Sequence, residues 1–345
     1  MGHGNFSRRI RIDGALLTAA LALLGSSPAI GQGTGAGARY DTSDAALVKT
    51  LPGFSNGSAK VNGIQMHYVV GGKGAPLVLL PGWPETWWEY HKVMPALARR
   101  FRVIVVDIRG MGSTDKPAGG YDKKTMAQDV YALVRHLGYT KVNIAGHDIG
   151  SMVAFSFAAN HPEATRKLAV LDVPHANELF GKISILPEYG KFGKKIDAQH
   201  PLFPWWFAVA QVPALPEKLF DGRYGMIQNW AFDYLTKDSK SIDARDRAVF
   251  VAAYAKKGGI HAGCAWFQNF SKDIIDNKKY VNLQMPVLGL GSVGYEWLKY
   301  SLPAQVKHFR ILKIENSGHY FLDEQPTVTT NLLSEFFRAP DGAFR

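Results

Sequence analysis

An aspartate stands between two glycines in the segment Gly-His-Asp-Ile-Gly (146–150). A short apolar run, 142–145, precedes this segment, and a stretch of helical character, 151–160, follows it. A sharp strand-to-helix turn needs such glycines because its backbones approach too closely for side chains, and it presents its central residue at the carboxyl end of a sheet. A carboxylate there can attack a saturated carbon and form an ester. We therefore expect Asp148 to be a nucleophile, and the alternative is an aspartate that caps the following helix.

Hydrolysis of such an ester needs a base and an acid that orients it. His319 follows the last apolar run, and an imidazole that titrates near neutrality suits the activation of water. The orienting acid most often lies in the loop after the penultimate strand, here 291–294. This loop contains no acid, and the first acid after it is Glu296. Asp172 ends the run 167–171 and offers another position. We favour Asp172, with Glu296 as the alternative, as the carboxylate that fixes the imidazole tautomer.

The tetrahedral intermediate of ester hydrolysis needs hydrogen-bond donors. The segment Pro-Gly-Trp-Pro-Glu-Thr-Trp-Trp (81–88) follows another buried run. We expect the backbone N–H groups of Trp83 and Ile149 to converge on the carboxyl oxygen of Asp148 as an oxyanion hole. The Trp83-Pro84 bond is a candidate cis peptide, which would turn the Trp83 amide inward.

The elements that position these residues follow from the pattern of apolar runs. Asn62-Gly63 separates two strand-like runs and predicts a hairpin. Short apolar runs without alternation predict strands buried on both faces of a sheet, at 76–80, 101–106, 142–145, 167–171, 287–290 and 309–314. Helical stretches at 90–99, 125–137, 151–160 and 327–337 separate or follow them. The pattern predicts an α/β fold with a doubly wound, mostly parallel sheet. The core would comprise 52–173 and 282–345, and the aromatic, helical segment 174–281 would be an inserted lid.

Composition narrows the class of protein. The 345 residues are 46% hydrophobic and 20% charged, which is ordinary for a globular chain. The net charge is +11, but the lysines and arginines are scattered and form no stripe, so we expect no nucleic-acid partner. The single cysteine, Cys264, excludes an intramolecular disulfide. The sequence leaves the oligomeric state open, with a homodimer as one option.

The amino terminus has the pattern of an export signal. Arg8, Arg9 and Arg11 precede the apolar run 15–24, which is too short to span a bilayer comfortably and is followed by small residues. We predict a signal peptide at 1–31, a flexible lead-in at 32–51 and a secreted or periplasmic product without integral membrane association. General secretion and twin-arginine export are both left open.

Four segments of the chain resemble the epoxide hydrolase and hydrolytic dehalogenase branch of the α/β-hydrolase superfamily. They are 81–88, where Pro81 stands in the place of a histidine that is usual in the family, together with 107–117, 146–150 and 317–319. The resemblance implies an α/β-hydrolase fold. Asp172 lies where secreted bacterial epoxide hydrolases and fluoroacetate-type dehalogenases place their acid. No metal or organic cofactor is implied, since the aspartate and histidine supply the chemistry.

The lid departs from these relatives. Epoxide hydrolases usually have two lid donors, Tyr with Tyr or His with Tyr; Trp205 falls at or near the first position and Phe267 at the second. Trp205, Phe267 and His261 are therefore the lid residues that we expect at the substrate. Other lid candidates are Tyr189, Tyr224, Tyr234 and Tyr254. Fluoroacetate dehalogenases need an arginine directly after the nucleophile, where this chain has Ile149.

These features together predict an enzyme that acts on a small hydrophobic molecule. A neutral, aromatic lid suits a neutral substrate. We expect an epoxide hydrolase-like enzyme, with a hydrolytic dehalogenase as the alternative. A ligand-binding or weakly active relative is the alternative from another class.

Overall fold

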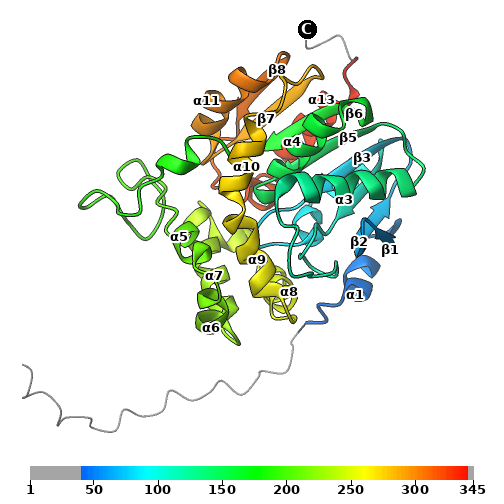
Figure 1. Cartoon of the computed structure of the whole chain (residues 1–345). Helices are drawn as coiled ribbons and strands as arrows, with labels where there is room; N and C mark the ends of the chain where they lie inside the picture. Colours follow the sequence, from blue (N-terminus) through cyan, green and yellow to red (C-terminus); the bar gives the residue numbers. More distant parts are fainter. Residues whose placement is uncertain (1–39, 341–345) are drawn as a thin grey trace, which may run out of the picture. The chain divides into compact units, whose positions relative to one another are not determined.

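The computed structural model describes residues 40–340. The predicted export signal, 1–31, lies outside these residues. The described chain is built on an eight-stranded sheet in the order β1-β2-β4-β3-β5-β6-β7-β8 (Figure 1). The strands are β1 (Phe54–Val61), β2 (Ile64–Gly71), β3 (Ala75–Leu80), β4 (Phe101–Val106), β5 (Val142–His147), β6 (Thr165–Leu171), β7 (Val287–Gly291) and β8 (Phe309–Lys313). β2 pairs antiparallel with both β1 and β4, and all other pairings are parallel, so the predicted α/β fold with a mostly parallel sheet is confirmed.

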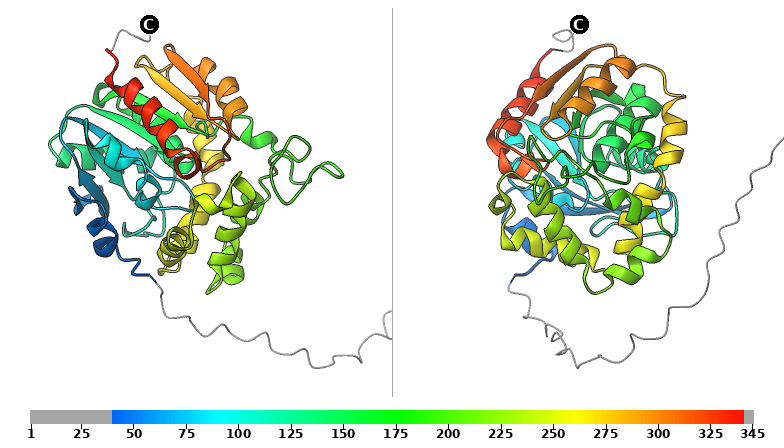
Figure 2. Two further views of the ribbon diagram at one scale, coloured as in Figure 1. Left: turned by 180° about the vertical axis from the view of Figure 1, so that it is seen from behind. Right: turned by 90° about the vertical axis from the view of Figure 1, so that its left-hand side faces the viewer.

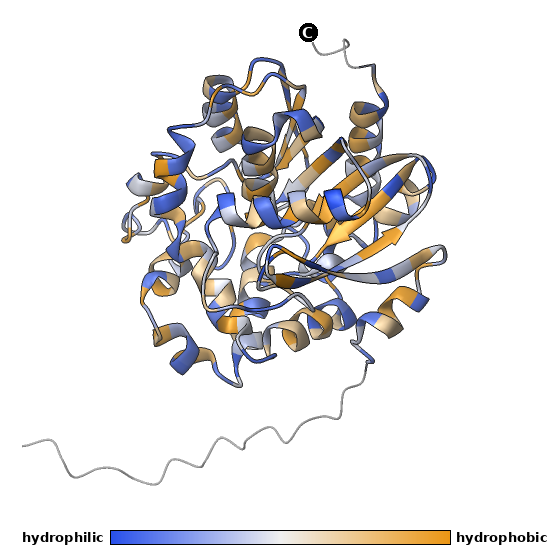
Figure 3. Cartoon of the chain, turned by 45° about the vertical axis from the view of Figure 1, so that its right-hand side comes forward, coloured by the Kyte–Doolittle hydropathy of each residue, from blue (hydrophilic) through white to orange (hydrophobic). Residues whose placement is uncertain are grey.

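The middle of the sheet is buried on both faces. Every residue of β5 is buried, and so are the last four residues of β3 and the last five of β6. In Figure 3 much of the sheet is coloured as hydrophobic. Helices α3 (Lys123–His136) and α4 (Ile149–Asn160) cover one face, and α13 (Pro326–Arg338) covers the other (Figure 2). The carboxyl ends of the parallel strands therefore meet at one edge.

The amino-terminal side differs from expectation at two places. Residues 44–49, within the predicted flexible lead-in, form helix α1 (Asp44–Lys49), whose Leu47 is fully buried against the core. The predicted helix at 90–99 is shorter, because a 3-10 turn, η1 (Trp87–Tyr90), precedes it and α2 (Met94–Leu97) has a proline in its first turn. The hairpin at Asn62-Gly63 forms as predicted, with positive φ at both residues.

The remaining elements follow the chain beyond β5. A 3-10 turn, η2 (Pro162–Ala164), precedes β6, and η3 (Phe180–Lys182) and η4 (Ser239–Ser241) lie in the inserted segment. The segment 174–281 carries α5 (Trp206–Gln211), α6 (Leu215–Phe220), α7 (Tyr224–Leu235), α8 (Ala244–Tyr254), α9 (Gly259–Gln268) and α10 (Phe270–Asn277). Helix α11 (Tyr295–Gln305) follows β7, and α12 (Phe321–Glu324) precedes α13. Among residues 40–340, no helix is long and apolar enough to cross a membrane.

The inserted helices lie beside the carboxyl edge of the sheet. In Figure 1, α5 to α9 form a layer below the strands, while α10 leads back alongside α3. A long irregular stretch, 183–204, joins η3 to α5 and extends away from the rest of the chain. The pocket described next lies between this layer and the sheet.

Candidate active site

The turn between β5 and α4 holds Asp148 in a strained conformation. Its φ of 50° and ψ of −120° are unusual for a residue with a side chain. A Cβ at position 146 would lie 2.1 Å from the carbonyl oxygen of Gly150, and a Cβ at 150 would lie 2.2 Å from that of Leu80. Both glycines are therefore required for the turn to fit against β3, and the turn projects the Asp148 side chain beyond the strand.

The carboxylate of Asp148 faces the predicted oxyanion loop. Its Oδ1 accepts the backbone N–H of Trp83 at 2.9 Å, and the Trp83-Pro84 bond is cis. It accepts no hydrogen bond from the first turn of α4, so the geometry does not support the helix-capping alternative. The second predicted donor, the N–H of Ile149, lies at the start of α4 next to the carboxylate without bonding to it in this structure.

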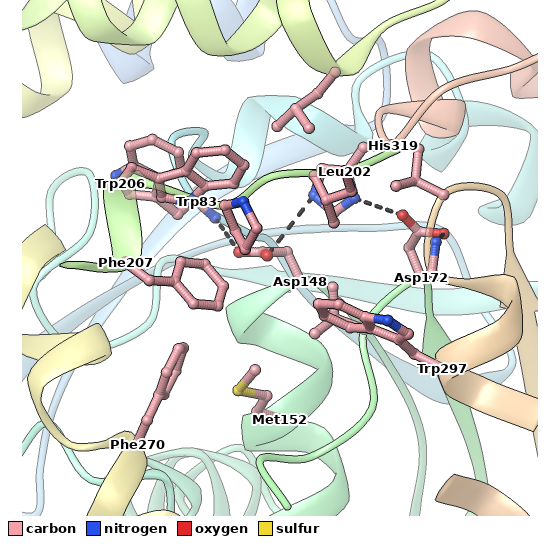
Figure 4. A pocket seen from close by; sticks show the side chains of 15 residues that line it. Trp83, Asp148, Met152, Asp172, Leu202, Trp206, Phe207, Phe270, Trp297 and His319 are labelled. Atoms are coloured by element: carbon pink, nitrogen blue, oxygen red, sulfur yellow. Dashed lines mark hydrogen bonds and ion pairs between the residues drawn. The ribbon is translucent and has the colours of Figure 1, made fainter. Parts of the chain in front are cut away.

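His319 bridges the other two predicted residues (Figure 4). Its Nδ1 is 2.6 Å from Oδ2 of Asp172, and its Nε2 is 3.7 Å from Oδ2 of Asp148. The alternative acid, Glu296, lies on the surface in α11, where it pairs with Lys299. Asp172 is therefore the carboxylate that orients the imidazole in this structure.

Asp172 is fixed by the loop that follows β7. Its Oδ1 accepts the N–H groups of Ser292 at 2.6 Å and Gly294 at 2.9 Å, which leaves Oδ2 for the imidazole. A Cβ at position 294 would lie 1.6 Å from the carbonyl oxygen of Asp172, so this contact needs a glycine. The carboxylate is almost fully buried, and backbone donors replace its lost hydration.

A buried ion pair that sequence reasoning missed lies behind the nucleophile. His147 Nδ1 is 2.9 Å from Oε1 of Glu89, and His147 Nε2 is 3.0 Å from the carbonyl oxygen of His319. The second oxygen of Glu89 accepts the N–H of Gly82, next to the oxyanion loop residue, at 2.6 Å. The pair thus connects the turn of Asp148, the loop of His319 and the loop of Gly82.

The ion pair changes the protonation of His147. Burial alone would lower the pKa of His147, but the Glu89 carboxylate, together with the two acids of the site, raises it to about 9. His147 is therefore a cation at neutral pH. Its ring centroid is 4.5 Å from that of His319, so a positive charge lies beside the predicted base.

We expect this histidine to lower the free energy of unfolding as the pH rises into the alkaline range. The pKa of His147 is about 9 in the folded chain and 6.5 ordinarily, so the folded form binds the proton more tightly. This contribution is complete below pH 6.5 and is lost as the pH rises through about 9. At about 1.4 kcal/mol per pKa unit, the loss is on the order of 3 kcal/mol.

Urea unfolding measured from neutral to alkaline pH tests this expectation. Glu89→Gln removes the partner charge and should flatten the alkaline decline in the free energy of unfolding. His200→Gln is the control, since His200 lies near the surface beside Asp197. An alkaline decline that is equally steep in Glu89→Gln would show that the pair is not its source.

The pocket in front of Asp148 is mostly apolar. It encloses about 540 Å³ of empty space, including its open mouth. It is lined by Trp83, Asp148, Met152, Asp172, Val173, Leu202, Pro204, Trp206, Phe207, Leu235, Phe270, Val293, Gly294, Trp297 and His319. Apart from the two acids and the histidine, the only polar side-chain groups in this lining are indole N–H groups. The pocket therefore suits a neutral, hydrophobic ligand.

The three expected lid residues lie outside this lining, which corrects the sequence-based expectation. Trp205 packs on Trp230, with ring centroids 5.0 Å apart. Phe267 packs edge-on against Trp83 at 5.6 Å, in a smaller neighbouring cavity. His261 is half-exposed, and its Nδ1 is 3.2 Å from Glu217.

The four tyrosines named as further lid candidates also lie outside the lining. Tyr224 accepts the indole N–H of Trp83 at 2.7 Å, and Tyr254 donates to the carbonyl oxygen of Glu85 at 3.2 Å. The hydroxyl of Tyr234 accepts the N–H of Phe203, and Tyr189 is fully exposed. The aromatic residues that do line the pocket from the lid are Trp206, Phe207 and Phe270. Trp205 and Trp206 are adjacent in sequence, and the rotation of α5 about its axis places Trp206, rather than Trp205, in the lining of the pocket.

Within residues 40–340, three clusters of acidic and histidine side chains have potential ligand atoms within 4.8 Å of one another. They are Glu85 with Glu89 and His147, Asp44 with His67 and Asp107, and His91 with Asp246 and Asp323. Each cluster contains a close pair between a histidine and a carboxylate, at 2.9, 2.8 and 3.6 Å respectively. These pairs account for the short distances, and none of the clusters contributes to the lining of the pocket.

Comparisons with known proteins agree with this geometry. A family model described as alpha/beta hydrolase fold matches residues 75–210. The soluble epoxide hydrolase of Corynebacterium sp. (strain C12) is 33% identical over 301 residues, which cover 81% of this chain and 96% of the relative. The fluoroacetate dehalogenase of Burkholderia sp. is 27% identical over 301 residues, covering 82% and 94%. The crystal structure of Cfl2 from Burkholderia cenocepacia matches with a TM-score of 0.73 at 30% identity, covering 84% and 97%.

The chain belongs to the α/β-hydrolase family. Within it, the chain falls in the branch of epoxide hydrolase-like and dehalogenase-like hydrolases, as the four sequence motifs predicted.

Proposed function

We propose that this chain hydrolyses a neutral, hydrophobic small molecule through a covalent ester on Asp148, and that an epoxide is its substrate. The observation that carries this proposal is the contact of His319 with both acids: Nδ1 pairs with Asp172 at 2.6 Å while Nε2 faces Asp148 at 3.7 Å. A base that faces a carboxylate, rather than a hydroxyl, suits hydrolysis of an ester formed on that carboxylate.

The first step uses the free oxygen of the nucleophile. Oδ1 of Asp148 is held by the Trp83 N–H, so Oδ2 attacks the electrophilic carbon of the substrate. A carbon–oxygen bond forms, the bond from that carbon to the ring oxygen breaks, and the ring oxygen acquires a proton from solvent. The product is an alkyl ester of Asp148.

The second step uses the base. Nε2 of His319 removes a proton from water, and the oxygen of that water attacks the carboxyl carbon of Asp148. Negative charge develops on Oδ1, where the Trp83 N–H stabilises it. The bond from the carboxyl carbon to Oδ2 breaks, and the alkoxide takes the proton from His319 and leaves as the alcohol. The Asp148 carboxyl group, which now carries the oxygen of the water, loses its remaining proton to solvent. Asp172 stabilises the imidazolium while it exists.

The lining of the pocket supports a neutral substrate. No lysine or arginine lines it, and Met152 contributes to its wall. A haloacid would bring a carboxylate into this pocket without a cation to pair it, which is costly.

A specific observation favours a second candidate, a hydrophobic organohalide. No hydroxyl side chain lines the pocket. A halide leaves without a proton, whereas the oxygen of an opened epoxide needs one. The first step would then expel a halide in place of the ring oxygen, and the second step would hydrolyse the ester in the same way.

Single turnover in ¹⁸O-labelled water tests the covalent step. Enzyme in excess over a panel of aryl and alkyl epoxides and haloalkanes should release a first product whose new oxygen is unlabelled, because that oxygen comes from Asp148. Label should appear in the carboxylate and then in later products. A labelled first product would mean that water attacks the substrate directly, and a panel without any turnover would favour a ligand-binding relative.

We also propose that residues 1–31 direct export and are removed. The apolar run 15–24 between arginines and small residues supports this. Intact mass of the exported protein should correspond to a chain that begins after this segment. An exported protein of full length would contradict the proposal.

A further inference from the structure

The irregular segment 183–204 is longer than ordinary connections in a compact domain. Loops of this length without regular structure are uncommon, and they are usually either functional segments or linkers. The segment extends from the body of the chain in Figure 1 and in the left view of Figure 2, and its large apolar side chains Ile185, Leu186 and Tyr189 are largely exposed. Four lysines and two acids are interspersed between 182 and 197.

A groove is formed by residues of this segment together with Trp297 of α11. It holds about 1080 Å³ of empty space, part of which is open solvent. Most of its lining is apolar, with Leu186, Pro201, Leu202, Phe203 and Trp297 among the contributing residues. Glu188 and Lys191 are its charged side chains and have opposite signs, so the groove does not select for a charged ligand.

The groove adjoins the pocket of Asp148. Leu202, Pro204 and Trp297 line both spaces, so these three side chains form the boundary between them. A ligand that places its reactive carbon at Asp148 and continues past this boundary enters the groove. The groove continues the apolar lining of the pocket toward solvent, so the part of a long ligand that does not fit in the pocket can lie in it.

We propose that this groove binds the apolar tail of an elongated substrate whose reactive carbon lies at Asp148. The substrate class is then a long-chain alkyl epoxide, or the corresponding haloalkane, rather than a compact one. This inference rests on the proposed function. Burial of methylene groups against Leu186, Leu202 and Phe203 supplies the affinity, since removing apolar surface from water is favourable.

Kinetics with terminal epoxides from epoxybutane to epoxydodecane test the proposal in the full-length enzyme. Each added methylene should raise kcat/KM by about twofold in an open groove, because complete burial of one methylene is worth about 0.8 kcal/mol, or about fourfold. The increase in kcat/KM should come from a decrease in KM. Concentrations are kept below those at which the longest substrates aggregate.

A pair of neighbouring residues provides a matched comparison. Leu186 lines the groove and Ile185 does not, although the two are 74% and 75% exposed. Leu186→Ser should raise KM for the long epoxides several-fold and leave the short ones unchanged. Ile185→Ser removes a similar apolar side chain from the same segment and should match the wild type with every substrate. Both positions are too exposed for their substitution to endanger folding.

Two results would overturn the inference while leaving the proposed function in place. One is turnover of short and long substrates with equal kcat/KM. The other is an identical response to Leu186→Ser and Ile185→Ser, which would assign the effect to the general hydrophobicity of the segment. Absence of turnover with every substrate would instead remove the proposed function, and this inference with it.

Discussion

His319→Gln is expected to stop turnover and to leave the enzyme alkylated on Asp148. The first step needs the Asp148 carboxylate but no base, whereas the second needs Nε2 of His319, which lies 3.7 Å from that carboxylate. Loss of a general base slows its step by roughly 10²–10⁴-fold. Ester should therefore accumulate to nearly one equivalent, which intact-mass measurement detects.

The mass of the trapped species also identifies the substrate class. An epoxide adds its whole mass to the protein, because no atom leaves. A haloalkane adds its mass less that of the hydrogen halide. His136→Gln is the control, since His136 is exposed at the end of α3 and should behave as wild type. Unchanged turnover by His319→Gln, without an adduct, would contradict the assignment of the base.

Asp172→Asn is expected to block the same step by imposing the wrong tautomer. Oδ1 of Asp172 accepts two backbone N–H groups, from Ser292 and Gly294, so the oxygen of an asparagine would stay on that side. Its amide N–H₂ would then donate to Nδ1 of His319. The proton of a neutral imidazole would have to lie on Nε2, which could no longer accept one from water.

The expected fall in kcat is on the order of 10⁴-fold, as for removal of an orienting acid in a comparable triad. Alkylation of Asp148, followed by intact mass in a stopped reaction, should keep its rate within a few-fold of wild type. Glu296→Gln tests the alternative acid and should be nearly silent, because Glu296 is paired with Lys299 on the surface. The assignment fails if Glu296→Gln is the damaging variant and Asp172→Asn is not.

The core was predictable because buried parallel strands leave a simple pattern in sequence. β3 and β4 coincide with the predicted runs to within one residue, since each is an apolar segment between polar turns. α11 was not predicted, because it begins directly after the glycine-rich loop 291–294 and contains Pro303, both of which suggest irregular structure.

The reacting residues were predictable from their turns, and the residues around them were not. Asp148 could be predicted as the nucleophile because its turn requires the glycines on both sides of it. Trp205 and Trp206 are equally aromatic, and which of them faces the pocket depends on the phase and docking of α5. The pairing of Glu89 with His147 joins residues far apart in the chain, and neither has a sequence signature, because burial of a charged pair depends on the packed structure.

The attachment of Asp172 to the loop after β7 has a consequence for how such sites diverge. β6 and β7 are adjacent in the sheet, and the loop after β7 donates two N–H groups to the same Asp172 carboxylate that lies 2.6 Å from Nδ1 of His319. We therefore expect that evolution or protein design can move the orienting carboxylate from the end of β6 to the end of β7 while the histidine and the nucleophile stay in place.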